Sequence, residues 1–323
     1  MDKQTMKKST IPSTNNISSS NNTSNTPSFP RPIIGIIGGS GVYNLEGVIT
    51  RNKHFISTPY GEPSGPILEG EIQGIPFLFL PRHGYNHTIS PSEINYCANI
   101  YALKALGVHY LLSFSAVGSL SESLPPGTFV AIDQFFDATK GLRRRSFFGE
   151  GIVGHVSCAY PIDSELQKIL FEECQKHQIP SALGGTYVCI EGPTFSTRAE
   201  SFFYRSLSSS SSSSLAFSSK TNASVIGMTN VPEAFLAKEA GISYATMAMV
   251  TDFDCWTDHH CTVEEIVAFA QKNTQTAQRL IPSLLEEIHK NPPMRKLENQ
   301  NAVMTHKAAI SEEKQKILDV LLT

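Results

Sequence analysis

The stretch from Val225 to Val250 constrains the fold most, because it has the order strand, helix, strand. A short apolar run from Val225 to Met228 is followed by a helix-prone segment that Pro232 can begin and Gly241 can end. The next run, Ile242 to Val250, is apolar enough for a strand that is buried on both faces. Such a strand is typical of a sheet covered by helices, so we expect an α/β fold.

Two carboxylates directly follow the second strand. Thr251, Asp252, Phe253 and Asp254 stand at its carboxyl end, which is where ligands bind in open α/β sheets. Two aspartates two residues apart can project to the same side, so that one acts on a bound base and the other supports it. The alternative is a solvated loop with ordinary surface acids.

The composition limits the classes of protein to consider. The chain has 323 residues, 40% hydrophobic and 17% charged, which is enough for one large core or two smaller ones. A net charge of −3 gives no general attraction to nucleic acid or to an anionic membrane, and no run reaches the roughly 18–20 apolar residues of a membrane span. Six cysteines without a CxxC pair indicate reduced thiols in a cytosolic protein. The adjacent His259 and His260 lack a third partner, so we expect no metal site.

Three segments differ in composition from the predicted domain at residues 31–290. Residues 1–30 form a tail rich in Ser, Asn and Thr, and a serine tract interrupts the chain at about 207–222. Neither segment has enough apolar side chains to pack a core, so both are predicted to be disordered. The polar residues 291–323 form a C-terminal extension, with a peripheral helix expected over 310–322.

Three predicted strands end in groups suited to bind an anion: 33–37 before Ser40 and its glycines, 75–80 before Arg82 and His83, and 110–114 before Ser115 and Ala116. Glycines expose backbone N–H groups, arginine offers a planar fork for phosphate oxygens, and histidine can donate or take up a proton near neutral pH. Each group has a plainer alternative: a tight turn, a surface salt bridge or a structural histidine. The recurrence at three strand ends favours an oxyanion site.

Another loop supplies candidates for binding a flat ring. After a predicted strand at 185–190 come Phe195, which can stack on such a ring, and Ser196, which can contact its edge. Core packing is the alternative for Phe195. The run Arg143–Arg145 has no interleaved aromatic residues, so we predict a solvated loop there and not a nucleic-acid patch.

A set of longer motifs then resembles a known family. In chain order, from roughly residue 33 to 285, they are IGIIGGSG, PRHGYNH, INYCANIYALKALGV, SAVGSL, PPGTFVAIDQFFD, EGPTFSTRAES, GMTNVPEAFLAKEAG and TDFDCW. They resemble the trimeric class of the purine nucleoside phosphorylase family, in particular its members that act on methylthioadenosine. The resemblance implies one domain with a mixed central β-sheet flanked by helices, assembled into a homotrimer with active sites near subunit contacts. It also implies a cytoplasmic enzyme, with the nucleus as a second location.

The activity that the resemblance implies is phosphorolysis. Inorganic phosphate, a co-substrate, attacks the anomeric carbon of methylthioadenosine and releases adenine and 5-methylthioribose 1-phosphate in purine and methionine salvage. No cofactor or metal is needed. The alternatives are a phosphorylase for 6-oxopurine nucleosides or methylthioinosine, and a nucleoside-binding protein that has lost catalysis.

The resemblance also assigns roles to single residues. The phosphate site is expected from Ser40, Arg82, His83, Ser115, Ala116 and Thr229. Met228 and Phe253 are expected to bind substrate, Met228 under the ribose, and Phe195 to stack on the purine. Asp252 would assist departure of the base at N7, and Asp254 would lie near its exocyclic amine. Ser196 and Val263 are expected to set specificity, Val263 beside the 5′ substituent. Ser40 and Ser115 stand where many relatives have threonine, which keeps the hydroxyl.

Overall fold

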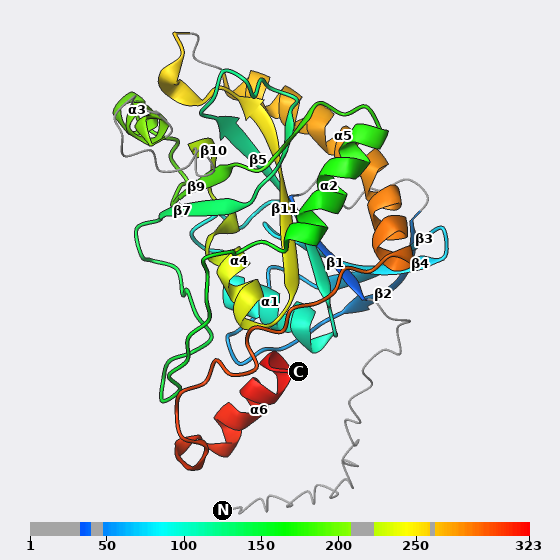
Figure 1. Cartoon of the computed structure of the whole chain (residues 1–323), viewed down its shortest axis with the longest axis vertical. Helices are drawn as coiled ribbons and strands as arrows, with labels where there is room; N and C mark the ends of the chain where they lie inside the picture. Colours follow the sequence, from blue (N-terminus) through cyan, green and yellow to red (C-terminus); the bar gives the residue numbers. More distant parts are fainter. Residues whose placement is uncertain (1–32, 40–47, 208–222, 259–261) are drawn as a thin grey trace, which may run out of the picture.

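The computed structural model describes residues 33–39, 48–207, 223–258 and 262–323. Within these ranges a mixed eleven-stranded sheet is surrounded by six α-helices (Figure 1). The strands are β1 (Ile34–Gly38), β2 (Ile49–His54), β3 (Ile67–Ile72), β4 (Ile75–Pro81), β5 (Tyr110–Ser119), β6 (Phe129–Ala131), β7 (Gln134–Ala138), β8 (Ser181–Leu183), β9 (Thr186–Ile190), β10 (Ala223–Gly227) and β11 (Ser243–Asp252). The helices are α1 (Tyr96–Ala105), α2 (Ser164–Lys176), α3 (Arg198–Ser206), α4 (Asn230–Glu239), α5 (Val263–Lys290) and α6 (Glu312–Leu321). The predicted fold class is confirmed.

The long strands β5 and β11 form the middle of the sheet. They pair in parallel along nearly their whole length, and almost all of their side chains are buried, as their apolar sequences require. On its other edge, β5 pairs with β1 up to Ser113 and with β10 at Gly118 and Ser119. Between these two partners, residues 114–117 have no strand neighbour on that edge among the described residues. This gap in the sheet opens onto the pocket described below.

The helices cover the sheet with their apolar faces. Helices α2 and α5 pack against each other and against β11 (Figure 1). Helix α1 packs against α4 and, at the end of the chain, against α6. The start of α5 is fixed by a capping box, in which Thr262 and Glu265 each bond the other's backbone N–H. This cap fixes the first turn of α5, from which Ile266 and Val267 line the pocket.

Most of the predicted elements are confirmed, but several end elsewhere. β5 continues to Ser119, so Ser115 and Ala116 lie within the strand and not after it. β11 continues to Asp252, which is its last residue. β6 and β7 lie on either side of Asp133 and pair with different neighbours, β6 with β11 and β8, and β7 with β9. Asp133, between β6 and β7, accepts the backbone N–H of Gly185 through its Oδ1 at 3.0 Å.

The C-terminal extension contains the expected helix, as α6. Asn299 ties the extension to the domain, because its Nδ2 donates to the carbonyls of Glu239 and Leu321, each 2.9 Å away. The predicted tail at 1–30, nearly all of the serine tract at 207–222, Ser40, His259 and His260 lie outside the described residues. Among the helices that the structure describes, none combines the length and apolar character needed to span a bilayer.

Candidate active site

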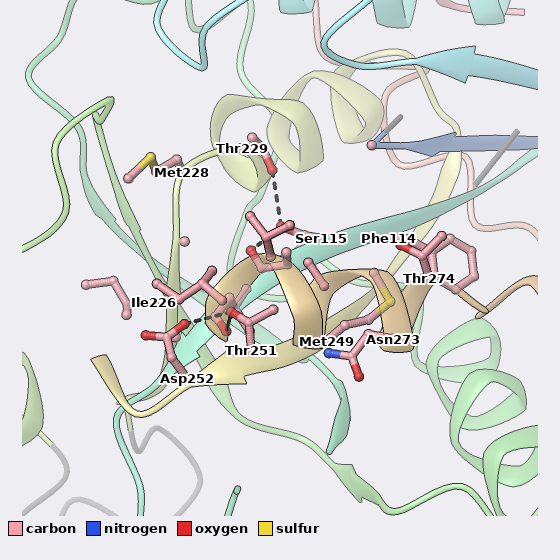
Figure 2. A pocket seen from close by; sticks show the side chains of 18 of the residues that line it. Phe114, Ser115, Ile226, Met228, Thr229, Met249, Thr251, Asp252, Asn273 and Thr274 are labelled. Atoms are coloured by element: carbon pink, nitrogen blue, oxygen red, sulfur yellow. Dashed lines mark hydrogen bonds between the residues drawn. The ribbon is translucent and has the colours of Figure 1, made fainter. Parts of the chain in front are cut away.

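A pocket of about 800 Å³ lies where β4, β5, β10 and β11 end, and α5 forms one of its walls (Figure 2). Many of the residues predicted for the site line it although they are far apart in sequence. These are Arg82, His83, Ser115, Ala116, Phe195, Ser196, Met228, Thr229, Asp252 and Asp254. The fold therefore brings the predicted anion-binding groups and the predicted carboxylates to one cavity.

The two carboxylates form a compact turn at the end of β11. Asp252 Oδ2 accepts the backbone N–H of Asp254 at 2.9 Å, and Thr251 Oγ1 lies 2.7 Å from Asp252 Oδ1 (Figure 2). This side-chain bond to the residue two positions on places Asp254 at φ 47°, a conformation that aspartate tolerates better than most residues. Both carboxyls thereby face the pocket, and the solvated-loop alternative is wrong.

Burial changes the acidity of both carboxyls. It raises the pKa of Asp252 above its ordinary value, and it raises the pKa of Asp254 to about 6, with a further contribution from the nearby Asp252 charge. Gly118 on β5 lets the Asp252 carboxyl pack closely against the β5 backbone, because a β-carbon at position 118 would lie only 3.2 Å from Asp252 Oδ2. A pair of half-buried acids with raised pKa values is suited to proton transfer.

Arg82 also lines the pocket and is buried, so the surface salt bridge considered for it is excluded. Its Nε and Nη2 bond the two oxygens of Glu233 at 2.7 and 2.9 Å. Nη2 also donates to Ser113 Oγ at 2.7 Å, and Nη1 donates to the carbonyl of Phe114 at 3.0 Å. The arginine fork expected to face an anion is thus occupied by a carboxylate, and one Nη1 proton has no acceptor among the described residues.

His83 has a defined tautomer. Its Nδ1 lies 2.9 Å from the carbonyl of Ile89, which can only accept, so Nδ1 carries the proton and Nε2 has a free lone pair. Burial, followed by the nearby Arg82 charge, lowers the pKa of His83 to about 4. The expectation that this ring takes up a proton near neutral pH is therefore wrong. At neutral pH it offers an acceptor to the pocket.

Ser115 and Thr229 present neighbouring hydroxyls to the pocket. Ser115 Oγ lies 3.2 Å from Thr229 Oγ1 (Figure 2). Thr229 is the residue before α4, yet its side chain makes no capping hydrogen bond. Its hydroxyl is available to the pocket for that reason. The third oxygen of the group is Tyr187 Oη, 3.1 Å from Ser115 Oγ.

Met228 lines the pocket at the turn between β10 and α4, and an unexpected residue holds this turn. Arg143 is buried, and its Nη1 donates to the carbonyls of Met228 and Val231, both at 2.7 Å. Its Nε bonds Glu191 Oε1 at 2.8 Å. The prediction that Arg143 belongs to a solvated loop is wrong, because this side chain joins the chain segments after β9 and β10. Its neighbours Arg144 and Arg145 are exposed, as expected.

Phe195 and Ser196 line the pocket, and the ring of the first and the hydroxyl of the second are both free to contact a ligand. Phe195 is 63% exposed, which excludes core packing for its ring. Ser196 Oγ is buried and has no hydrogen-bond partner within the described part of the chain. A buried hydroxyl without a partner is uncommon, and a bound ligand would satisfy it.

Two predicted residues do not line the pocket. Phe253 packs edge-on against Trp256, with ring centroids 5.7 Å apart. Val263 is the first residue of α5 and is 63% exposed, whereas Ile266 and Val267 on the same helix do line the pocket. Ser40 lies outside the described residues, although Gly39 before it lines the pocket. The roles assigned to these three residues stay predictions.

Comparisons with known proteins point in one direction. A model of the phosphorylase superfamily matches residues 33–286. The chain is 49% identical over 257 residues to the S-methyl-5′-thioadenosine phosphorylase of Bradyrhizobium diazoefficiens, which covers 79% of this chain and 83% of the relative. It is 46% identical over 286 residues to the protein of that name from Rhodospirillum rubrum, which covers 86% and 92%.

Solved structures agree with these matches. A crystal structure of methylthioadenosine phosphorylase from an Antarctic soil metagenomic library superposes with a TM-score of 0.81 and 43% identity, over 90% of this chain and 98% of that one. The methylthioadenosine phosphorylase of Schistosoma mansoni, solved with adenine, gives a TM-score of 0.72 and 34% identity, over 80% of this chain and 92% of that one.

Proposed function

The chain belongs to the phosphorylase superfamily, and from this we propose that it cleaves S-methyl-5′-thioadenosine with inorganic phosphate. The products are adenine and 5-methylthioribose 1-phosphate, and the reaction serves purine and methionine salvage. One structural observation carries the proposal: a single pocket joins two half-buried carboxylates to a cluster of hydroxyls beside a buried arginine. This arrangement is suited to a reaction in which a base leaves from one side of a sugar while an anion attacks from the other.

The reaction needs charge control on both sides of the sugar. A phosphate oxygen forms a bond to the anomeric carbon while the bond from that carbon to N9 breaks, and the bonding electrons pass to the purine. The raised pKa of Asp252 supports its role as the acid that gives a proton to N7. The phosphate anion itself stabilises the developing positive charge on the sugar.

The phosphate is held by Ser115 and Ala116 on β5, by Thr229 before α4, by Arg82 and His83 at and after the end of β4, and by Ser40. Because His83 is neutral with a free Nε2, it accepts a hydrogen bond from the hydroxyl of a monoprotonated phosphate. Arg82 contributes the positive charge of its buried guanidinium and the remaining Nη1 proton.

The base and the 5′ group are recognised at the rim. Phe195 stacks on the adenine, Ser196 bonds its edge and Asp254 lies near the exocyclic amine. Met228 and Phe253 contact the nucleoside. Val263 borders the methylthio group, together with Ile266 and Val267, whose side chains line the pocket. An apolar wall favours a methylthio group over a hydroxyl by about 1–3 kcal/mol.

The proposal predicts that adenine release from S-methyl-5′-thioadenosine requires phosphate or arsenate. Adenine is measured by chromatography with and without phosphate. Release that is equally fast without either anion would disprove phosphorolysis, and binding of the nucleoside without consumption of phosphate would indicate a protein that has lost catalysis.

The same assay separates the alternative, a phosphorylase for 6-oxopurine nucleosides or methylthioinosine. The carboxylates of Asp252 and Asp254 can accept a hydrogen bond from a 6-amino group but not from a 6-oxo group. We expect kcat/KM for S-methyl-5′-thioadenosine to exceed that for inosine by at least ~10²-fold. A preference for inosine would reject our assignment of the substrate.

The proposal includes a homotrimer with active sites near subunit contacts. Phe195, Val263 and Val267 expose apolar surface beside the pocket, and a subunit contact there would bury it. Sedimentation should give about three times the chain mass of 35.3 kDa. We place the protein in the cytoplasm, with the nucleus as a second location, and fractionation of cells tests this. The cysteines in the described residues are all free thiols, in keeping with a reducing compartment.

A further inference from the structure

Tyr187 is a fully buried phenol that the proposed reaction does not yet use. It lies on β9, and its ring reaches beneath β10 toward the pocket without lining it. Gly227 leaves the space for it, because a β-carbon at that position would lie 2.1 Å from Tyr187 Oη. The phenol oxygen is therefore held tightly behind the wall of the site.

The hydrogen bonds of Tyr187 Oη have a definite direction. The backbone N–H of Thr229, which can only donate, points to Oη at 3.4 Å. Oη thus accepts from the amide, and its own proton needs an acceptor, since a buried hydroxyl proton without one is costly. Ser115 Oγ, 3.1 Å away, provides that acceptor.

This direction continues to the pocket. Ser115 Oγ accepts the hydrogen bond from the phenol, so its own proton can point to Thr229 Oγ1 at 3.2 Å, to the carbonyl of Ala116 at 3.5 Å or into the cavity. The bond to Ala116 is the longest of these, and in the other two arrangements the three oxygens end with a hydroxyl proton directed at the pocket. Without the phenol, Ser115 and Thr229 can satisfy each other in either direction, and neither is fixed as a donor to a ligand.

We propose that Tyr187 is a positioning residue that fixes the Ser115 and Thr229 hydroxyls as hydrogen-bond donors to the phosphate. The inference rests on the phosphate site proposed above. Tyr187 contacts no substrate itself and acts through Ser115. It should affect the binding of phosphate and leave the binding of the nucleoside unchanged.

Tyr187→Phe tests the proposal, because the ring that packs the core is kept and only the hydroxyl is lost. We expect the KM for phosphate to rise by about tenfold, the usual effect of one hydrogen bond to a charged group, while the KM for S-methyl-5′-thioadenosine stays within twofold. Tyr110→Phe is the matched control. Tyr110 is also buried, and its Oη donates to the carbonyl of Pro293, away from the pocket. Both variants lose the hydrogen bonds of a buried phenol, two for Tyr187 and one for Tyr110, but only Tyr187→Phe should alter the KM for phosphate.

Ser115→Ala separates failure of this inference from failure of the phosphate site. If Ser115→Ala raises the KM for phosphate but Tyr187→Phe raises it no more than Tyr110→Phe does, the positioning role is wrong and the site stands. If Ser115→Ala leaves that KM unchanged, both are wrong. In the double variant, adding Tyr187→Phe to Ser115→Ala should have little further effect, since Tyr187 acts through Ser115. Fully additive effects would also overturn the inference.

Discussion

Replacing Asp252 with asparagine should lower kcat for S-methyl-5′-thioadenosine by about 10²- to 10⁴-fold, the range for loss of a general acid. Burial raises the pKa of the Asp252 carboxyl above its ordinary value, which brings this group closer to the range suited to proton transfer. Asparagine has nearly the same shape, and its amide oxygen can still accept the backbone N–H of Asp254. The fold should therefore be retained. Adenine release at saturating phosphate and nucleoside measures the effect.

Asp258→Asn is the matched control for this variant. Asp258 follows the same turn, but its side chain is fully exposed and pairs with Arg198 on the surface. Its replacement should leave kcat within twofold of wild type, because a surface ion pair contributes little. Thermal unfolding confirms that both proteins are folded. An Asp252→Asn enzyme that keeps more than a tenth of the wild-type kcat would remove Asp252 from the role of acid.

The sequence predicts the centre of this fold well, because the central strands are apolar throughout. β5 and β11 are buried on both faces, so their composition alone separates them from helices and loops. The hairpin of β2 and β3 was not predicted. β2 has the sequence ITRNKH, and most of its side chains are exposed, so it has neither an apolar run nor a clear alternation. An edge strand of this kind is held by its neighbour and leaves little local signal.

The sequence also brings the main site residues to the right strands, but it cannot show how they are bonded. Arg143 looked like part of a solvated basic run because its neighbours Arg144 and Arg145 are. Its partners Glu191 and Met228 lie far along the chain, and only the fold brings them within hydrogen-bond distance. A buried ion pair formed by distant residues has no local pattern to reveal it.

Positions at element ends are the hardest to predict. The resemblance places Val263 beside the substrate, and it does not point to Ile266 and Val267, which line the pocket from the same helix. Each residue along a helix turns the side chain by about 100°, so the side chains that face a cavity depend on where the helix starts and how it packs. The capping pair of Thr262 and Glu265 was the local signal for that start.

Replacing Glu233 with alanine should destabilise the protein by about 3–5 kcal/mol, the usual effect of leaving one member of a buried ion pair alone. Glu233 is fully buried and accepts from Arg82 through both oxygens. Its Oε1 also accepts from Ser113 Oγ at 2.9 Å and from Tyr244 Oη at 2.8 Å. In the alanine variant these donors lose their acceptor, and the buried positive charge of Arg82 loses its partner. Urea unfolding measures the change, which is a large share of the ~5–15 kcal/mol that stabilises a typical domain.

Two further variants identify the cause of that loss as charge. Glu172→Ala removes an exposed glutamate that pairs with Lys168 and should change stability by less than ~0.5 kcal/mol. A double variant, Arg82→Met with Glu233→Leu, removes both buried charges, so it should be more stable than Glu233→Ala alone, although it should no longer bind phosphate well. If Glu233→Ala lies within 1 kcal/mol of wild type, or if the double variant is no more stable than it, Arg82 does not depend on this carboxylate. We expect a large loss of stability for Glu233→Ala and a partial recovery in the double variant. A buried guanidinium needs a nearby negative charge when no anion is bound to it, and the Glu233 carboxylate provides that charge.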